Sequence, residues 1–386
     1  MKNYAGSSVT VFIIFLLISF HSTKAQLSGG IDYSLIYNDN PYRLSDGSEE
    51  FVNSYMVNLG YQPLKEKLNL SYSFGLNDFR NIADRSYNLH SFGFNYSFKF
   101  LDTSQEEENV SFGASYTLKQ NNSDDKLYKY NAYSFSASGK FYLTDNLLFV
   151  SGYKFNKKNY PSLFNLTYTD NSAYLRSSLF FETGTALHLE TQLGNRAYSI
   201  KNLSQGYSTS SQYSHQMGRM GRSADVKTTD ETQLLTTFKV SQSIFENTGI
   251  NIYYSLRNNL NKSSSISLTE FMYSDDEDLW DDPFSFEGSD LGSEFLQILP
   301  WDMTFKISGQ YSTRRYKENL ADSLNLRQRH DGRTELWFGL SKEFNSVPLL
   351  NSIELGVEYM HIINSSSENY FTYKNNLFLF RAGVSF

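Results

Sequence analysis

Residues 377–386, LFLFRAGVSF, place an apolar side chain at every second position up to the last residue. The row consists of Phe378, Phe380, Ala382, Val384 and Phe386. Alternate side chains of a β-strand share one face. The stretch is therefore expected to be a strand with one apolar side that ends on an aromatic residue.

Short segments with the same alternation recur along the whole chain. Between Met303 and Tyr311 the odd-numbered residues are apolar or glycine and the even-numbered ones are polar. Residues 68–77, 110–119 and 250–257 repeat the pattern. Period two with small polar partners is typical of strands that are apolar outside and polar inside a barrel. We expect strands near 28–39, 50–61, 67–79, 86–100, 109–121, 129–143, 147–157, 171–183, 186–199, 230–244, 250–262, 287–298, 303–316, 332–344, 352–363 and 372–386.

The intervals between these strands alternate in length. The tight ones lie at 143–146, 183–185, 245–249 and 299–302, and the long ones at 40–49, 158–170, 200–229, 263–286 and 317–331. Short turns at one end and longer loops at the other are typical of transmembrane β-barrels. A soluble β-sandwich or propeller, the main alternative, has no reason to keep this parity.

The terminal strand and the alternating intervals together resemble those of bacterial outer-membrane β-barrel proteins of porin-like size. The resemblance implies an all-β, transmembrane, antiparallel up-and-down barrel of about 16 strands over residues 26–386, with 14 or 18 strands left open. It also implies that the barrel assembly machinery recognises Phe386, and that the partners include outer-membrane lipid and lipopolysaccharide. The resemblance holds for the class and points to no particular family.

The first 25 residues have the features of a secretory signal peptide. Lys2 precedes the apolar run Val11–Phe20, and Thr23-Lys24-Ala25 leaves small residues at both positions of a cleavage site. The run is short for a transmembrane helix. We expect export across the inner membrane of a Gram-negative bacterium and a mature chain that starts near Gln26, with the outer membrane as its destination.

Composition supports a barrel and excludes several classes of protein. The chain contains 29 Tyr, 31 Phe and 3 Trp among 386 residues, and such residues favour strands and membrane-interface girdles. It has no cysteine, which excludes disulfides and zinc–thiolate sites. The formal net charge of −7 becomes −9 without Lys2 and Lys24, which does not suit nucleic-acid binding. No nucleic-acid partner is therefore expected.

Strand parity assigns nine ionisable side chains to the inner, lumen-facing side. A cation that faced lipid at mid-depth would cost roughly 2–4 kcal/mol, whereas one that faces water costs little. These charges form either a solvated wall of mixed sign or a constriction whose transverse field selects small polar solutes. The nine residues are Lys119, Arg176, His188, Glu190, Lys239, Arg257, Lys306, Glu354 and Glu358.

Two long intervals differ in charge. Residues 263–300 contain ten carboxylates and no Lys or Arg, while 200–230 contain Lys201, Arg219, Arg222 and Lys227. Carboxylate oxygens suit Ca²⁺, but no EF-hand spacing is present, so a solvated acidic outer loop is the simpler interpretation and no metal site is predicted. Its densest part comprises Asp275, Asp276, Glu277, Asp278, Asp281 and Asp282. We expect this part to attract Arg219 and Arg222 on the preceding outer loop.

Nothing in the sequence indicates catalysis or a cofactor. Residues 213–223 faintly resemble the motif of outer-membrane phospholipases, but Met217 stands where that motif has its nucleophilic serine. His90, His330 and His361 lack metal-ligand spacing, and no phosphate loop or dinucleotide fingerprint appears. We expect a non-enzymatic, porin-like channel for small hydrophilic solutes. The alternatives are a surface-binding or structural barrel with an occluded lumen, and an export conduit that works with periplasmic partners.

Overall fold

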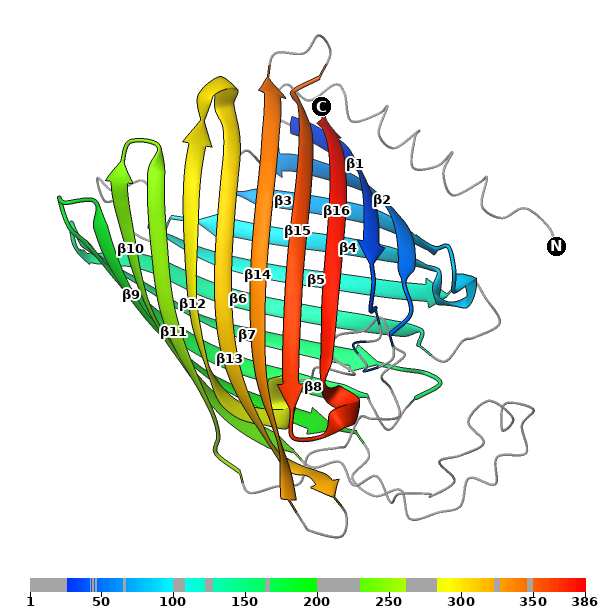
Figure 1. Cartoon of the computed structure of the whole chain (residues 1–386). Coiled ribbons are helices and arrows are strands. Elements are labelled where there is room, and N and C mark those ends of the chain that lie inside the picture. The colour runs from blue at the N-terminus through cyan, green and yellow to red at the C-terminus, as the bar shows by residue number, and fades with distance from the viewer. Residues whose placement is uncertain are drawn as a thin grey trace.

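The computed structural model describes residues 26–386 except 42, 44, 46, 65–66, 100–107, 122–127, 164–166, 200–229, 262–282, 323–326 and 346–349. Sixteen antiparallel strands close into one barrel, in which each strand pairs with its neighbours in the chain and β1 pairs with β16 (Figure 1). The predicted class, an all-β antiparallel barrel of 16 strands, is confirmed. The expected signal peptide, residues 1–25, lies outside the described residues.

The strands are long and the helical segments are short. No helix in the described ranges is long and apolar enough to cross a bilayer. The strands are β1 (Gln26–Asn38), β2 (Glu50–Leu64), β3 (Leu68–Phe79), β4 (Tyr87–Phe98), β5 (Asn109–Asn121), β6 (Tyr130–Thr144), β7 (Leu147–Asn159), β8 (Tyr168–Phe180), β9 (Thr185–Tyr198), β10 (Glu231–Phe245), β11 (Thr248–Asn259), β12 (Phe286–Leu299), β13 (Met303–Asp322), β14 (Arg327–Asn345), β15 (Ser352–Ser366) and β16 (Tyr373–Ser385). The short 3₁₀ segments are η2 (Ala83–Arg85), η6 (Pro283–Ser285), η7 (Pro300–Asp302) and η8 (Asn369–Phe371).

The largest difference from the expected strand boundaries is the β13–β14 hairpin. The sequence predicts strands over 303–316 and 332–344 with a long interval between them. The structure instead continues the pairing through Leu320↔Gln328 and Asp322↔Arg327, after a register shift. The apolar alternation of the sequence stops at Tyr316, and residues 317–322, which continue the strand, have no period-two pattern. The period-two signal therefore ends before the strands do.

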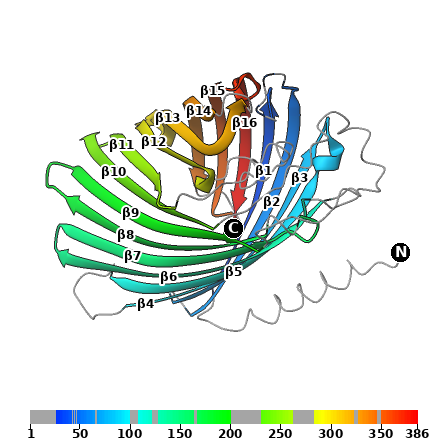
Figure 2. The same ribbon diagram turned by 90° about the horizontal axis from the view of Figure 1, so that it is seen from below.

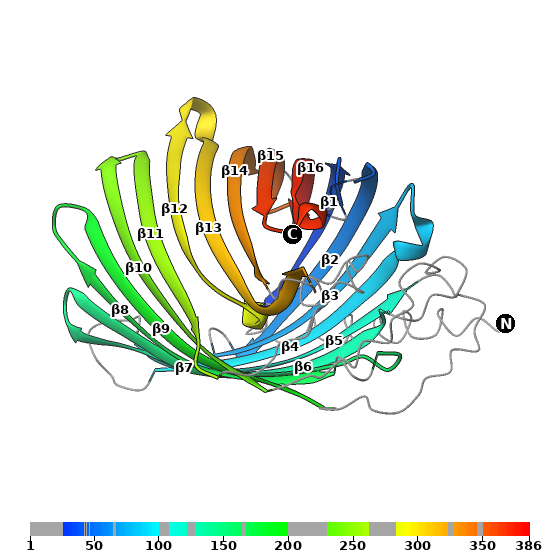
Figure 3. The ribbon, with the colours of Figure 1, turned by 60° about the horizontal axis from the view of Figure 1, so that its bottom comes forward.

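The two ends of the barrel differ. β1 begins and β16 ends at the same end, and the connections predicted as tight lie there too (Figure 1). We call this the turn end. The connections predicted as long join the strands at the opposite end, which we call the mouth; Figure 3 brings this end forward.

The barrel closes through the first and last strands. Gly29 N–H donates to the Phe386 carbonyl oxygen at 2.8 Å, and Phe386 N–H donates to the Gly29 carbonyl oxygen at 2.9 Å. The Phe386 ring lies over Gly29, where an added Cβ atom would come within 2.6 Å of it. The terminal residue thus belongs to the closing seam, while its recognition by assembly machinery remains a prediction.

The register keeps one set of side chains on one face around the whole ring. Tyr33 lies opposite Ala382, for example, and the apolar row of β16 continues onto β1. The other face lines the inside of the closed ring and is concave. On it the Tyr253 hydroxyl of β11 reaches over Gly292 of β12 and donates to Gln310 Oε1 of β13 at 2.8 Å. We call this concave face inward and the apolar face outward.

Candidate functional site

The inward face of β3–β6 is a neutral wall of small side chains. Ser71, Gly93, Gly113, Ser115 and Ser136 contribute to a groove of about 310 Å³ along this wall. Hydroxyl groups bond to one another across the strands, as between Ser91 and Thr117 at 3.2 Å. Small residues leave the wall flat and polar, since no described inward side chain between Asn69 and Ser138 on these four strands is charged except Lys119 at the mouth.

The inward face of β6–β10 is positively charged. Arg176 pairs with Glu190 at 2.5 Å, and Lys239 lies opposite His188 in the register. His188 Nδ1 lies 2.8 Å from Ser178 Oγ. Among the described residues, this wall carries three carboxylates, Asp170, Glu190 and Glu231, against six cations: Lys140, Lys154, Lys158, Arg176, Arg196 and Lys239.

The inward face of β12–β16 and β1 is negatively charged. Arg381 bonds to Glu354 at 2.7 Å and lies 3.8 Å from Glu358, so one cation serves two carboxylates. Within the described ranges this wall carries five cations, Lys306, Arg314, Arg329, Arg333 and Arg381. Its eight carboxylates are Asp32, Asp290, Glu294, Asp331, Glu335, Glu343, Glu354 and Glu358.

The two charged walls face each other across the barrel. In a ring of 16 strands, strands eight places apart lie opposite, so β7 faces β15 and β6 faces β14. Figure 2 shows β14, β15 and β16 on the side of the ring opposite β6, β7 and β8. The basic side of the lumen therefore lies opposite the acidic side, an arrangement that produces a transverse electric field.

Cations stack on aromatic rings where the inward face meets the mouth. Lys119 lies 4.1 Å from the Tyr87 ring centre, Lys158 lies 4.2 Å from that of Tyr130, and the Arg196 guanidinium lies 3.9 Å from that of Tyr168. Cation–π attraction strengthens when the charge is desolvated, and Lys119, Lys158 and Arg196 are all buried. Three of the inward cations near the mouth are thus buried against aromatic rings.

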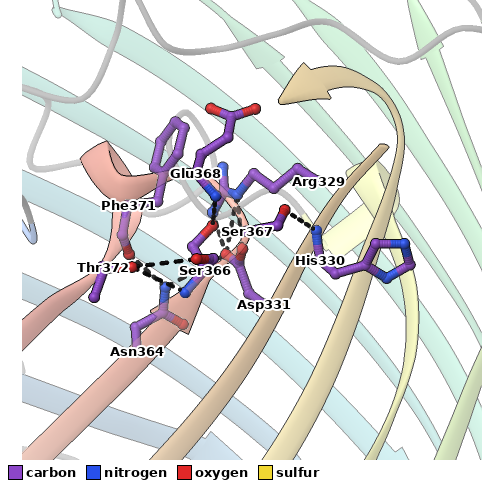
Figure 4. Close-up of polar contacts among 9 residues, drawn as sticks. All are labelled: Arg329, His330, Asp331, Asn364, Ser366, Ser367, Glu368, Phe371 and Thr372. Atoms are coloured by element: carbon purple, nitrogen blue, oxygen red, sulfur yellow. Dashed lines mark hydrogen bonds and ion pairs between the residues drawn. The ribbon is translucent and has the colours of Figure 1, made fainter. Parts of the chain in front are cut away.

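Arg329 is the centre of a further cluster of this kind (Figure 4). Its guanidinium lies 3.5 Å from the Phe371 ring centre and 4.1 Å from that of Tyr316, and it forms an ion pair with Asp331. Asn364 Nδ2 donates to the Phe371 carbonyl oxygen at 2.7 Å. Through the Arg329–Phe371 contact, η8 in the β15–β16 connection packs against β14, and the Asn364 hydrogen bond ties it to β15.

Glu368 precedes η8 and takes no part in the ion pair. Its carboxylate points away from the other polar groups of the cluster (Figure 4). Burial raises the pKa of this carboxyl above its ordinary value; nearby Arg329 lowers the pKa and Asp331 raises it, and the net shift is upward. Glu368 is therefore a titratable group at the mouth.

All nine residues that sequence parity assigned to the lumen lie on the inward face by register, but they do not form one cluster. Arg176, Glu190, His188 and Lys239 come together on β8–β10. Lys119 on β5 and Arg257 on β11 lie near the mouth, six strands apart in the ring. Lys306 lies on β13, and Glu354 and Glu358 share Arg381. A role for any of them in solute passage stays a prediction.

Sequence reasoning missed several charged residues of the lumen. Asp290 and Glu294 were counted with the acidic interval 263–300, but they belong to β12 and point inward. Arg381, Lys154 and Asp32 follow the same parity rule as the nine and could have been found by it. No sequence pattern predicts the Arg329 cluster. Arg329 of β14 meets Phe371 of η8 only because the loop between β15 and β16 brings η8 to β14.

The acidic stretch, Asp275, Asp276, Glu277, Asp278, Asp281 and Asp282, lies outside the described residues, and so do Arg219 and Arg222. The expected attraction between the two loops and the question of Ca²⁺ binding therefore stay open predictions. In the part of the chain that the structure describes, no three His, Asp or Glu side chains gather as a metal site requires.

Many large apolar side chains of the outward face are exposed. Phe378, Phe92 and Val357 are each at least 50% exposed. Near the mouth, outward tyrosine hydroxyls donate to asparagines that stand fourth in their strands: Tyr33 to Asn53 at 3.0 Å, Tyr153 to Asn171 at 2.6 Å and Tyr359 to Asn376 at 2.8 Å. On β2, β8 and β16 the outward face thus changes from apolar to polar at the same position near the mouth.

Comparison with known proteins gives similarity at the level of the fold. No family model and no curated protein matches the chain. The structure of OccAB1 from Acinetobacter baumannii superposes with a TM-score of 0.51 at 8% sequence identity, over 95% of this chain and 98% of that one. A bacterial polysaccharide outer membrane secretin gives a TM-score of 0.49 at 11% identity over 93% and 97% of the two chains. OprD from Pseudomonas aeruginosa gives 0.47 at 8% over 94% and 95%. The likeness to OccAB1 confirms the predicted class: this chain has the fold of the porin-like, 16-stranded barrels.

Proposed function

We propose that this protein is an outer-membrane channel through which small hydrophilic solutes diffuse passively. The observation that carries the proposal is the contrast between the two faces of the closed barrel. The outward face is apolar, while the inward face is polar, with its basic and acidic walls on opposite sides. Neither catalysis nor a cofactor has a part in this proposal.

The outward face supports placement in a membrane. In water, rings such as Phe378 and Phe92 would remain exposed, and contiguous apolar surface on this scale marks contact with a partner or a membrane. Tyrosines whose hydroxyls turn toward the polar side are typical of a membrane interface. In the proposed orientation the turn end faces the periplasm and the mouth faces the cell exterior. Residues 1–25 direct the export that precedes insertion.

The inward face supports an aqueous path. A barrel of 16 strands is wide enough to leave a water-filled interior. The charges of Arg176, Lys239 and Glu358 need water or partners, because an isolated buried charge is costly. Opposed basic and acidic walls orient solutes that carry both signs of charge. We infer that the preferred solutes are small and dipolar or zwitterionic.

Conductance of the purified protein in planar bilayers tests the proposal. Discrete, ohmic single-channel steps are expected for the native protein. Substituting glutamine for Glu354 and Glu358 should shift the reversal potential in asymmetric KCl toward anion permeability. Substituting glutamine for Arg176 and Lys239 should shift it toward cation permeability, because each wall concentrates its counter-ion.

Two results would reject the channel. Folded barrels that carry no current would favour the occluded surface-binding or structural barrel. A current that appears only after a periplasmic partner is added would favour the export conduit. The glutamine variants serve as matched controls for one another, since both pairs lie on the inward face and change the net charge by the same amount in opposite directions.

A further inference from the structure

A groove of about 500 Å³ lies on β11–β14 beside the mouth. Its lining includes Leu256, Ser289, Tyr311, Thr313, Arg315 and Gly332. By register these six positions belong to the outward face, and so do Tyr254, Asn258, Glu287 and His330. The inward positions Arg257, Gly288, Arg314 and Asp331 contribute the rest of the lining, so the groove lies mainly on the outward face.

Small residues between two rows of larger ones create the hollow. The cross-strand row Ser289, Thr313 and Gly332 forms the floor of the groove. On the mouth side of this row stand Glu287, Arg315 and His330. On the other side stand Leu291 and Tyr311, which are 53% and 52% exposed. The groove therefore has one charged end and one apolar end.

The charged end presents a cation. Arg315 bonds to Glu287 at 2.7 Å, but the arginine side chain is 55% exposed and that of the glutamate only 14%. Glu287 also accepts a hydrogen bond from the Asn259 N–H at 3.3 Å. The carboxylate is thus occupied within the protein, while the guanidinium and the exposed His330 face outward. A guanidinium in this setting matches a phosphate group.

The groove lies at the polar–apolar boundary of the outward face. On β2, β8 and β16 the fourth residue from the mouth is an asparagine that accepts a hydrogen bond from a tyrosine hydroxyl. On β12 the fourth residue is Ser289, on the floor of the groove. Arg315 lies four residues closer to the mouth than Tyr311, about 13 Å along the strand at roughly 3.3 Å per residue. Its guanidinium is therefore at headgroup depth when Tyr311 contacts acyl chains.

We propose that this groove binds the phosphorylated headgroup of an outer-leaflet lipid. Arg315 holds the phosphate, Ser289 and Thr313 hydroxyls bond to polar groups below it, and the acyl chains lie along Leu291, Leu256 and Tyr311. The inference rests on the proposed membrane placement but not on conduction. A protein without channel activity would still bind the lipid.

Native mass spectrometry of the full-length mature barrel in detergent tests the proposal, with bis-phosphorylated lipid A as the probe. One retained lipid per barrel is expected. Arg315→Gln should weaken retention roughly tenfold or more, because a charge-assisted hydrogen bond is lost. Arg80→Gln is the matched control: Arg80 is another exposed cation near the mouth, stacked on Phe51 at 5.9 Å and away from the groove. This variant should bind like the native protein.

A second variant and two competitors complete the test. Ser289→Leu fills the floor with a side chain that is compatible with lipid, and it should also reduce retention. Dephosphorylated lipid A should bind weakly, and inorganic phosphate should not displace the lipid. Native-like retention by Arg315→Gln, equal loss in Arg80→Gln, or displacement by millimolar phosphate alone would each overturn the lipid site. Channel conductance of the same samples is a separate measurement, so loss of lipid binding and loss of the proposed channel are told apart.

Discussion

Ile307 and Ser308 are adjacent in β13 and meet opposite surroundings. Ile307 lies between Phe295 and Phe338 on the outward face. Ser308 lies between Glu294 and Trp337 on the inward face. A single step along a strand thus exchanges the outward face for the lumen, which makes neighbouring substitutions a sensitive measure of the assigned faces.

We predict that Ile307→Lys destabilises the barrel far more than Ser308→Lys. A lysine that faces lipid near mid-depth costs roughly 2–4 kcal/mol. A lysine at position 308 faces the lumen, next to Glu294 in the register. Reversible urea unfolding in lipid vesicles measures both variants. Equal losses of stability would show that the faces are wrongly assigned.

Glu368 makes stability at the mouth depend on pH. The pKa of its carboxyl is raised in the folded protein, mainly by burial. A carboxyl with a raised folded-state pKa destabilises the fold once it ionises, so stability falls as pH rises from the ordinary carboxyl pKa to the raised one. Glu368→Gln should therefore raise the unfolding temperature at neutral pH and leave it unchanged below about pH 4.

The temperature at which heat-modifiable gel mobility is lost measures this effect. Glu354→Gln, a lumen carboxylate bonded to Arg381, is the control and should show no such gain. A Glu368→Gln variant that matches the native protein at every pH would show that the ionised carboxylate is not destabilising.

At the scale of elements, β12 and β13 approach unusually closely at Gly288. An added Cβ atom there would lie 1.8 Å from the Thr313 carbonyl oxygen, which is backbone and cannot rotate away. We predict that Gly288→Ala costs roughly 1–3 kcal/mol, as overpacking typically does. Gly139→Ala is the control, because an added Cβ there meets nothing within 4 Å. Urea unfolding of the two variants should separate them clearly; equal stability would mean that the strands relax freely.

The closing strand provides a prediction about assembly. We expect deletion of Phe386 to leave unfolded, protease-sensitive protein in the periplasm, because the resemblance to outer-membrane barrels implies recognition of this residue. The deletion also removes the backbone hydrogen bonds to Gly29 at 2.8 and 2.9 Å. Phe386→Tyr keeps those bonds and an aromatic end, so it should assemble normally. Normal outer-membrane yield of the deletion variant would contradict the prediction.

At the scale of the whole molecule, loop charge should add to the field of the walls. Asp275, Asp276, Asp278 and Asp282 follow β11 and precede β12, hence they belong to a mouth connection. Replacing all four with Asn should shift the reversal potential in asymmetric KCl toward anions. The shift should shrink at high salt, because screening acts over about 8 Å at physiological ionic strength.

A control for position replaces Asp145 and Glu246, two carboxylates in turns at the other end of the barrel, with Asn and Gln. An unchanged reversal potential at low salt would place the acidic loop away from any conducting path. That outcome would favour the binding or structural barrel.

How much could be predicted differs between the strands and the sites. All 16 strands were recognisable because a half-apolar strand repeats every two residues, a local property of the chain. Inward orientation of residues such as Lys239 and Glu358 followed from the same parity. The extension of β13 beyond Tyr316 could not be predicted in this way. The backbone pairing continues there, but the side chains no longer alternate between apolar and polar.

The sequence by itself determined which side chains share a face, because a strand allows only two orientations that alternate along it. Only the tertiary structure decided which walls oppose each other. The strands that carry Lys154 and Glu354 lie opposite each other because ring closure places β7 eight strands from β15, and no local sequence pattern encodes which strands oppose each other. The groove at Arg315 likewise exists only where three strands align their small residues, and this alignment depends on inter-strand register.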